Sequence, residues 1–278
     1  MNTLQTITAH GCTIPTIGLG TWTLRDQACA ELVSAALTGG YRHLDTARMY
    51  DNEVAVGEGL QASKVARAQV FVRTKVWPDD IADGDLQRSA EASLKRLGLD
   101  HVDLLLIHWP NAKIPLQSSI KALCETKKRG LAKHIGVSNF TVALLDEAVA
   151  LSSEPIVANQ CEYHPHLDTS KVIAACRKHG VAFVSYTPLG RGAIGGVLDE
   201  PVVKTIAARV KRTPAQVTLR WHLQQGIVAI PRSTNKGRVA ENLAVYDFEL
   251  TAADMAALSK LTRADGRVVN LAIAPKWD

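Results

Sequence analysis

Eight short apolar runs recur along the chain, with helix-like segments between them. Their starts lie 21 to 33 residues apart, except for the last interval of 46 residues. This spacing suits one strand plus one crossover helix in each unit, with a longer excursion before the last strand. The second to fourth runs mostly do not alternate with polar residues, as expected for strands covered on both faces. The runs are residues 17–19, 41–44, 70–72, 102–107, 135–137, 156–158, 181–184 and 227–230.

The segments between these runs carry helix signals. Apolar residues recur at the i, i+3, i+4 and i+7 positions of one helix face, and glycines predict where the helices stop. Polar residues before them predict the starts. These signals are apolar residues from Cys29 to Leu37 ahead of Gly39-Gly40, Asp83 capping a segment that Gly98 ends, and Thr213 capping a helix with Pro214 in its first turn.

Eight strand–helix units without a break in composition predict one α/β domain over residues 1–278, a closed (β/α)8 TIM barrel. An open doubly wound sheet is the alternative, because it is built from the same units. Residues 4–7 and 12–15, joined around His10-Gly11, predict an extra β-hairpin ahead of the barrel.

Composition narrows the class of protein. The 278 residues are 46% hydrophobic and 21% charged, which is typical of a soluble globular chain. No apolar run approaches the ~18 residues of a membrane span, and the N-terminus lacks a signal-peptide pattern. We therefore expect a cytoplasmic protein with no membrane partner. The net charge of +5 is scattered, which favours small anionic ligands over nucleic acid. We expect a monomer.

The five cysteines also point to a reducing compartment. They are odd in number and widely spaced, with no Cys-x-x-Cys pair. We interpret them as small core residues, with no disulfide and no zinc site made of thiolates. They are Cys12, Cys29, Cys124, Cys161 and Cys176.

The candidate chemistry follows the predicted strands, where barrel enzymes collect their active-site residues. Asp45 and Tyr50 follow the second run, Lys75 the third and His108 the fourth. Singly, each has an ordinary structural interpretation, such as a helix cap, a solvated lysine or a core histidine. Their placement after three consecutive strands predicts one shared site. Three indoles nearby predict an aromatic-walled pocket; they belong to Trp22, Trp77 and Trp109.

With these motifs in the observed order, the chain resembles the aldo-keto reductases, and among them the short bacterial 2,5-diketo-D-gluconate reductases, which also reduce methylglyoxal. The resemblance runs from about residue 18 to the C-terminus. It implies reduction of small aldehydes or ketones to alcohols with NADPH as cofactor. The matching stretches are residues 18–22, 45–50, Lys75, 106–110, 135–140, 159–160, 230–233, 238–242 and 274–278.

The resemblance implies a role for each candidate catalytic residue. Tyr50 would donate the proton to the developing alkoxide. Lys75 would lower the pKa of the Tyr50 phenol by about one to two units, because a nearby cation favours the phenolate. Asp45 would keep Lys75 charged and aimed at Tyr50, and His108 would orient the substrate carbonyl. Trp22, Trp77 and Trp109 would contact the substrate together with Tyr50 and His108.

The resemblance also implies the cofactor contacts. Ser138, Asn139 and Gln160 would hold the nicotinamide carboxamide, and Tyr186 would stack on its ring. Arg232, Ser233 and Arg238, with Glu241 and Asn242, would form the pocket for the 2′-phosphate and adenine. Many members carry Lys where this chain has Arg232, so the strength of the preference for NADP over NAD stays open. The remaining implied contacts are Gly20, Thr21, Trp22, Thr187, Leu189, Gly190, Arg191 and Thr234.

Three other interpretations can be weighed against this one. Residues 190–195 match Gly-x-Gly-x-x-Gly, but Asp199-Glu200-Pro201 then opens a helix, so we expect a loop beside the pyrophosphate and not a Rossmann site. A metal-dependent hydrolase using His43, His164 and His166 lacks convergent ligands, so we expect no metal. A catalytically weak, nucleotide-sensing regulatory subunit on the same barrel remains the alternative function.

Overall fold

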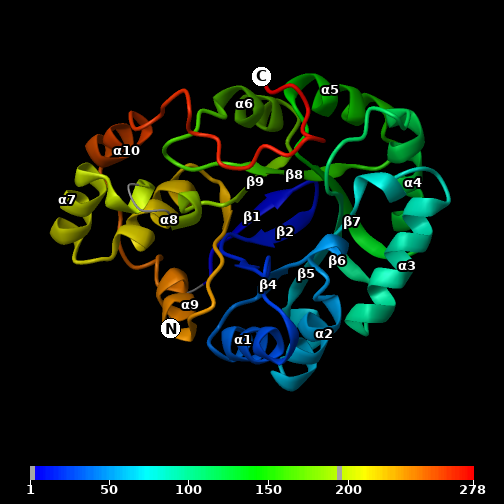
Figure 1. Ribbon diagram of the computed structural model, residues 1–278, viewed down its shortest axis with the longest axis horizontal. Coiled ribbons are helices and arrows are strands. Elements are labelled where there is room, and N and C mark those ends of the chain that lie inside the picture. Colours follow the sequence, from blue (N-terminus) through cyan, green and yellow to red (C-terminus); the bar gives the residue numbers. More distant parts are fainter. Residues whose placement is uncertain (1–3, 193–195) are drawn as a thin grey trace.

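The computed structural model describes residues 4–192 and 196–278. Eight parallel strands follow one another in chain order around a barrel (Figure 1). A backbone bridge between Ile17 and Ala229 joins the first strand to the last. The (β/α)8 prediction is therefore confirmed. The strands are β3 Leu19–Gly20, β4 His43–Asp45, β5 Phe71–Val76, β6 Val102–Ile107, β7 Ala132–Ser138, β8 Ile156–Glu162, β9 Ala182–Tyr186 and β10 Val228–Ile230.

Helices surround the barrel, and the long interval before β10 holds two of them, α7 and α8. None of the helices in the described ranges is long and apolar enough to cross a membrane. The helices are α1 Asp26–Thr38, α2 Glu53–Ala62, α3 Asp85–Leu97, α4 Leu116–Lys128, α5 Val142–Leu151, α6 Ser170–Lys178, α7 Pro201–Val210, α8 Pro214–Gln224, α9 Lys236–Leu243 and α10 Ala252–Ser259.

Most predicted helix ends are confirmed. Gly98 ends α3 in the left-handed conformation with φ of 66°, and the Thr213 hydroxyl accepts a hydrogen bond from the Gln216 amide at the start of α8. The Asp83 prediction is wrong. Gly84 occupies the N-cap position of α3, and the Asp83 carboxylate instead accepts bonds from Gln87 and Lys121.

The predicted hairpin is present, but its first strand is shifted. β1 spans Thr6–Ala9, two residues later than predicted, and β2 spans Cys12–Pro15 as predicted. The reason is the tight turn at His10 and Gly11, both at positive φ, which pairs Ala9 directly with Cys12. Cys12 and Ile14 pack with barrel residues such as Leu104 and so cover the N-terminal end of the barrel.

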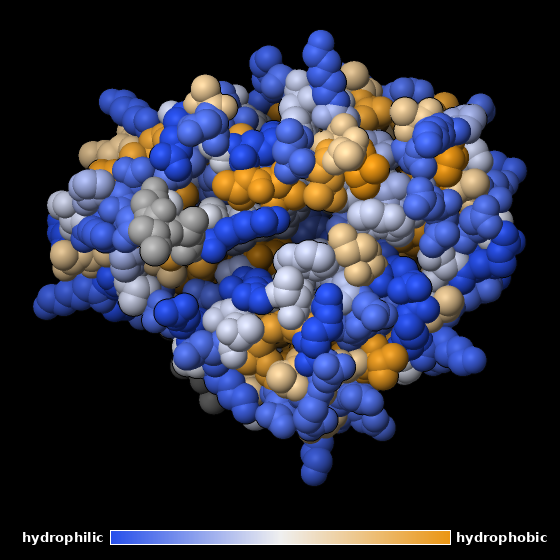
Figure 2. Space-filling model, viewed as in Figure 1, coloured by the Kyte–Doolittle hydropathy of each residue, from blue (hydrophilic) through white to orange (hydrophobic). Residues whose placement is uncertain are grey.

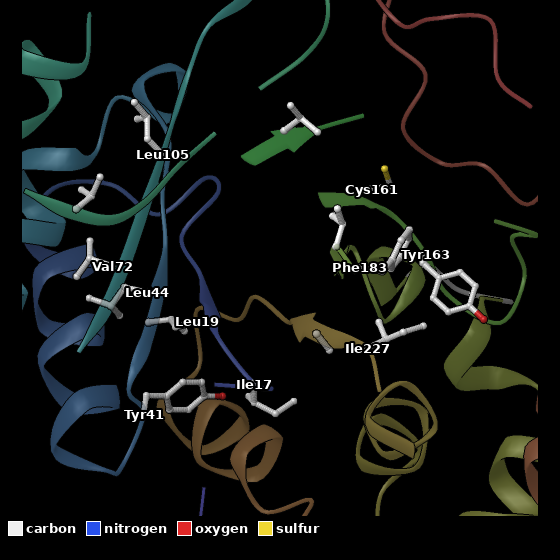
Figure 3. Packing of buried hydrophobic residues seen from close by; sticks show 14 of the residues in the cluster. Ile17, Leu19, Tyr41, Leu44, Val72, Leu105, Cys161, Tyr163, Phe183 and Ile227 are labelled. Atoms are coloured by element: carbon white, nitrogen blue, oxygen red, sulfur yellow. The ribbon is translucent and has the colours of Figure 1, made fainter. Parts of the chain in front are cut away.

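Two apolar clusters build the core. The larger one fills the space between the sheet and the helices (Figure 3). The smaller one lies inside the barrel. Strand β6 shows how the chain divides between them, because Leu104 and Leu106 face inward whereas Leu105 and Ile107 face the helices. This alternation follows from the two-residue period of a strand. All five cysteines are buried, as predicted for small core residues.

The same alternation places charged side chains inside the barrel. On β5, Phe71 belongs to the inner cluster and Val72 and Val76 to the outer one. Arg73 and Lys75 therefore point inward with Phe71, and they are 0% and 1% exposed. Because an unpaired charge in an apolar interior is very costly, these two cations require partners inside the barrel.

Candidate active site

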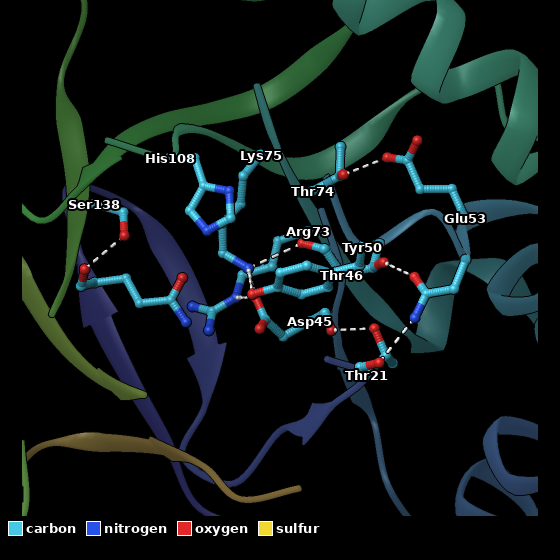
Figure 4. A network of polar contacts seen from close by, with 12 residues as sticks. Thr21, Asp45, Thr46, Tyr50, Glu53, Arg73, Thr74, Lys75, His108 and Ser138 are labelled. Carbon is cyan, nitrogen blue, oxygen red and sulfur yellow. Dashed lines mark hydrogen bonds and ion pairs between the residues drawn. The ribbon is translucent and has the colours of Figure 1, made fainter. Parts of the chain in front are cut away.

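The four candidate catalytic side chains meet at the C-terminal end of the barrel (Figure 4). The Lys75 ammonium donates to Asp45 Oδ1 at 2.7 Å, to the Thr46 carbonyl at 2.9 Å and to the Tyr50 hydroxyl at 3.2 Å. The His108 ring lies edge-on to the Tyr50 ring, with centroids 5.7 Å apart. A phenol, an ammonium and an imidazole therefore share one site.

The fold explains why these residues converge. Asp45 ends β4 and Lys75 lies near the end of β5, on the neighbouring strand. His108 follows β6 directly, and its amide bonds to the Val76 carbonyl at 2.9 Å. Tyr50 ends the short 3-10 helix η1, Arg48–Tyr50, which turns back toward the barrel at Asp51 with φ of 52°.

Buried polar contacts hold the loop that carries Tyr50. The Asn52 amide donates to the carbonyls of Thr21 and Leu24 at 2.8 and 3.0 Å, and its oxygen accepts from the Thr46 hydroxyl at 2.8 Å. Thr21 also donates to the Asp45 carbonyl at 2.9 Å. These bonds tie the ends of β3 and β4 together, so Tyr50 is presented by a rigid segment.

Arg73 joins this cluster, although the sequence analysis did not select it. Its Nε donates to Asp45 Oδ1 at 2.7 Å, the same oxygen that Lys75 contacts. Burial acts to raise the pKa of Asp45, but Arg73 and Lys75 outweigh it and lower that pKa to about 2. Burial lowers the pKa of Lys75 to about 8, against the opposing effect of Asp45. Asp45 is thus ionised at neutral pH and Lys75 carries its proton.

Tyr50 differs from the expectation. Burial raises its pKa well above the usual value of 10, and Asp45 adds to the rise while Arg73 opposes it. The predicted net lowering by Lys75 is therefore not found, because the loss of water around the phenol outweighs the effect of Arg73. Burial also lowers the pKa of His108 well below its usual range, and Lys75 adds to this effect. His108 is neutral and can donate one hydrogen bond.

A cavity of about 790 Å³ opens above these residues, and the face shown in Figure 2 is hollowed at its centre. The volume is within the range of small-molecule and cofactor sites. Most of the predicted site residues line it: Gly20, Trp22, Asp45, Tyr50, Lys75, His108, Trp109, Ser138, Asn139, Gln160, Tyr186, Thr187, Leu189, Arg191, Arg232, Ser233, Thr234, Arg238, Glu241 and Asn242.

This arrangement agrees with the relatives of the chain. The sequence model of the Aldo/keto reductase family matches residues 16–263. The chain belongs to the aldo/keto reductase family. It is 40% identical over 268 residues to the methylglyoxal reductase DkgB of Escherichia coli O157:H7, and this alignment covers 95% of this chain and 99% of the relative. It is also 46% identical over 250 residues to an aldo-keto reductase of Mycolicibacterium vanbaalenii, and this alignment covers 90% of this chain and 88% of the relative.

Solved structures of the family superimpose closely. A crystal structure of a 2,5-diketo-D-gluconic acid reductase B has a TM-score of 0.96 at 40% identity. The superposition covers 100% of this chain and 98% of the reductase chain. The aldo-keto reductase of Bombyx mori, in complex with NADP, has a TM-score of 0.90 at 33% identity. The superposition covers 96% of this chain and 95% of the Bombyx mori chain. Aldo-keto reductases use NADP(H).

At one end of the cavity, a single carboxamide is free among the three residues that the family resemblance assigns to the nicotinamide. Ser138 Oγ donates to the Gln160 carbonyl at 2.7 Å. The Asn139 amide donates to the His108 carbonyl at 3.0 Å, and its oxygen accepts from the Tyr186 hydroxyl at 2.9 Å. Both side-chain polar atoms of Gln160 are buried and have no partner in the described part of the chain. The site thus fits a ligand carboxamide.

At the other end, the two predicted arginines differ. Arg232 donates to the Trp22 carbonyl at 3.0 Å and to the Thr23 hydroxyl, which links β10 to the loop after β3 across the cavity. Arg238 is exposed near the start of α9, and its backbone amide bonds to the Asn235 side chain that caps this helix. A guanidinium near a helix N-terminus fits a phosphate group. Glu241 accepts from the Thr213 hydroxyl at 2.7 Å.

Three predicted contacts do not line the cavity. Thr21 is fully buried behind it and supports Asp45. Trp77 lies edge-on to the His108 ring, at 5.4 Å, and so backs that residue. Gly190 lies in the short helix η4, Gly190–Gly192, and packs toward Val197. Residues 193–195 of the glycine-rich motif lie outside the described residues.

The sequence analysis missed eleven lining residues, two of which lie in the C-terminal segment. The buried Glu162 carboxylate accepts bonds from the amides of Val268 and Val269 at 2.7 and 2.9 Å, which anchors this segment beside the barrel. An acid at the end of an apolar run was the one signal for this contact. The missed residues are Thr23, Met49, Pro188, Leu198, Thr213, Pro214, Ala215, Ile230, Pro231, Val269 and Leu271.

The histidines that prompted the metal interpretation have other partners. His164 pairs with Glu162 at 3.0 Å and His166 with Glu200 at 2.7 Å. His43 Nδ1 bonds to the Pro15 carbonyl at 2.9 Å. No group of three or more metal-binding side chains occurs among residues 4–192 and 196–278.

Proposed function

We propose that this protein reduces small aldehydes and ketones to alcohols with NADPH, and that Tyr50 donates the proton. The observation that carries this proposal is the contact of the Lys75 ammonium with both Asp45 and the Tyr50 hydroxyl at the base of the cavity. NADPH, when bound, would supply the hydride for the carbonyl carbon. The residues of this chain bind the substrate, orient it and supply the proton.

Tyr50 donates its hydroxyl proton to the carbonyl oxygen as negative charge develops there. The phenol is a weak acid in its buried site, so the phenolate that remains needs stabilisation. Lys75, at 3.2 Å, provides a positive charge for it. Asp45 keeps Lys75 protonated and aimed, because its own carboxylate is ionised. The cluster is therefore better suited to the charge distribution of the transition state than to that of the ground state.

His108 orients the substrate. Its ring is neutral at pH 7, and its Nδ1 has no partner among the described residues. A neutral imidazole can donate one hydrogen bond to a carbonyl oxygen without competing with Tyr50 as an acid. Its placement comes from the Trp77 ring and from the Asn139 side-chain amide, which donates to the His108 carbonyl at 3.0 Å.

The cofactor would lie along the cavity from Gln160 to Arg238. Gln160 offers a free carboxamide, and Tyr186 offers a ring on the same wall. Arg238, Arg232 and Ser233 would face the adenosine phosphate, which favours NADPH over NADH because only NADPH carries a 2′-phosphate. The NADP complex of the Bombyx mori relative supports this assignment.

The substrate class is a small carbonyl compound. Trp22, which is 39% exposed, and the C-terminal residues Val269 and Leu271 border the mouth of the cavity. The relatives named methylglyoxal reductase and 2,5-diketo-D-gluconic acid reductase point to small dicarbonyl compounds as substrates. We further propose that the protein acts in the cytoplasm as a monomer.

The test is a spectrophotometric assay of NADPH consumption with methylglyoxal, 2,5-diketo-D-gluconate and simple aldehydes. We expect turnover with at least one dicarbonyl, and slower turnover with NADH. Binding of NADPH without turnover of any carbonyl would contradict the proposal and favour a nucleotide-sensing role instead.

A further inference from the structure

Arg73 is a buried cation for which the proposed reaction has no assigned role. It is 0% exposed and lies inside the barrel, two residues before Lys75 on β5. In Figure 4 its side chain reaches into the cluster formed by Asp45, Tyr50 and Lys75. Its Nε donates to Asp45 Oδ1, but Nη1 and Nη2 have no hydrogen-bond partner in the described part of the chain.

The contacts leave an excess of positive charge beneath the cavity. Arg73 and Lys75 each lie 2.7 Å from the same oxygen of Asp45, so two cations share one carboxylate. Glu53 is the next acid, but it is engaged by Thr74 and Arg96. The buried cluster of Asp45, Arg73 and Lys75 therefore carries a net charge of about +1 at neutral pH.

A purely structural role explains Arg73 poorly. Burying a guanidinium with two of its three nitrogens unpartnered costs free energy. An apolar side chain of similar length would fill the same space without that cost, and Asp45 would still be paired with Lys75. The feature that only Arg73 adds is its charge.

We propose that Arg73 is a positioning residue for proton transfer, which acts through Asp45 and Lys75 to stabilise the negative charge left on the Tyr50 oxygen. Arg73 occupies part of the Asp45 carboxylate, so the positive charge of Lys75 is less neutralised and is available to the phenolate. This inference rests on the proposed function, because it concerns the same proton donor.

The direction of the effect follows from the groups around Tyr50. Reduction requires protonated Tyr50 beside protonated Lys75, so the rate falls when the pH rises through the apparent pKa of this pair. Without the Arg73 charge, the pKa of Tyr50 rises because a cation that stabilises its phenolate is lost. The pKa of Lys75 rises because a neighbouring charge of the same sign is lost. The charged and titratable groups that interact with Tyr50, Arg73 or Lys75 are Asp45 and His43 on β4, His108 after β6, Glu53 on α2 and Tyr186 on β9.

The experiment compares Arg73→Met with Arg73→Lys in the pH profile of kcat for carbonyl reduction. For Arg73→Met we expect reduction at pH 7 to slow by about tenfold and the alkaline limb to move up by about one pH unit. Arg73→Lys retains the charge, so its alkaline limb should stay close to that of the unmodified protein.

Dinucleotide binding provides a readout without turnover. The oxidised nicotinamide ring carries a positive charge, so Arg73→Met should tighten binding of NADP⁺ relative to NADPH by about fivefold. Fluorescence titration with each nucleotide measures this ratio. Arg73→Lys should leave the ratio unchanged.

Several outcomes would overturn the inference. One is a lower kcat of Arg73→Met without a shift of the alkaline limb of its pH profile. Another is an equal shift of the alkaline limb in Arg73→Met and Arg73→Lys. If Arg73→Met does not fold, Arg73→Gln takes its place, and failure of both neutral variants to fold would make Arg73 a structural residue. Turnover by the unmodified protein tests the proposed function separately, so failure of the proposed function is distinguishable from failure of the Arg73 inference.

Discussion

At the scale of single residues, the chemistry depends on the Tyr50 hydroxyl and the 3.2 Å contact that Lys75 makes with it. Tyr50 is almost fully buried, and its pKa is raised by that burial. A phenol in such a place would be inert without a cation at its oxygen. Asp45, 2.7 Å from Lys75, opposes the lowering of the Lys75 pKa by burial, so that the pKa is about 8 and the ammonium keeps its proton at neutral pH.

The first prediction concerns Tyr50→Phe. We expect carbonyl reduction to fall by on the order of a hundredfold or more, since the proton donor is removed. NADPH binding should persist, because the phenol occupies a small part of the cavity wall. Steady-state kinetics and fluorescence titration measure the two quantities. Tyr246→Phe, whose hydroxyl meets Thr16 away from the cavity, is the control and should retain full activity. Unchanged turnover in Tyr50→Phe would remove the phenol from the mechanism.

A second prediction belongs to Arg238. Replacement by His removes a permanent charge from the proposed 2′-phosphate pocket, so we expect binding of NADPH to weaken by about tenfold or more and binding of NADH to change little. Dissociation constants for both nucleotides measure the effect. Arg88→His, at an exposed position on α3, should change neither. Equal losses for NADPH and NADH would contradict the assignment.

At the scale of elements, helix α8 connects fold stability to the cavity. Thr213 caps this helix by accepting the Gln216 amide, and the Gln216 side chain accepts the Thr213 amide in return at 3.0 Å. The same hydroxyl donates to Glu241 on α9. One side chain therefore caps the start of a helix and orients an acid at the proposed adenosine site.

We predict that Thr213→Ala lowers the free energy of unfolding by about 1 kcal/mol, the usual cost of losing an N-cap oxygen. Thr213→Ser keeps the hydroxyl and should retain most of the stability. Urea denaturation of both variants measures the difference. Equal loss in the two variants would mean that the methyl group, and not the hydroxyl, stabilises this helix start.

At the scale of the whole molecule, the barrel interior buries titratable groups away from water. Burial lowers the pKa of His43 to about 3 and that of His222 to about 4. In the unfolded chain a histidine has a pKa of about 6.5. Between that value and the folded pKa the unfolded state binds more protons, so stability is lost as the pH falls from about 6.5 toward 3.

The corresponding prediction is a fall in the free energy of unfolding between pH 7 and pH 5 of about 2 kcal/mol for each such histidine. His43→Gln should remove its share of this pH dependence. Urea denaturation at both pH values measures it, and an unaltered dependence in His43→Gln would show that His43 does not titrate as inferred.

The sequence by itself determined the strand–helix units, which fit either a closed barrel or an open doubly wound sheet. It also determined that Asp45, Tyr50, Lys75 and His108 follow predicted strands, because strand period, helix caps and strand-end chemistry are local properties of the chain. It did not reveal Arg73 or the C-terminal lining, although the arginine stands within the otherwise mostly apolar stretch Phe71–Val76.

Only the tertiary structure decided how buried these groups are and which of them share a partner. Burial raised the pKa of Tyr50 against the local expectation, and barrel closure brought Arg73 and Lys75 to one oxygen of Asp45. Desolvation and cross-strand contacts depend on residues far apart in the chain, so no local pattern encodes them.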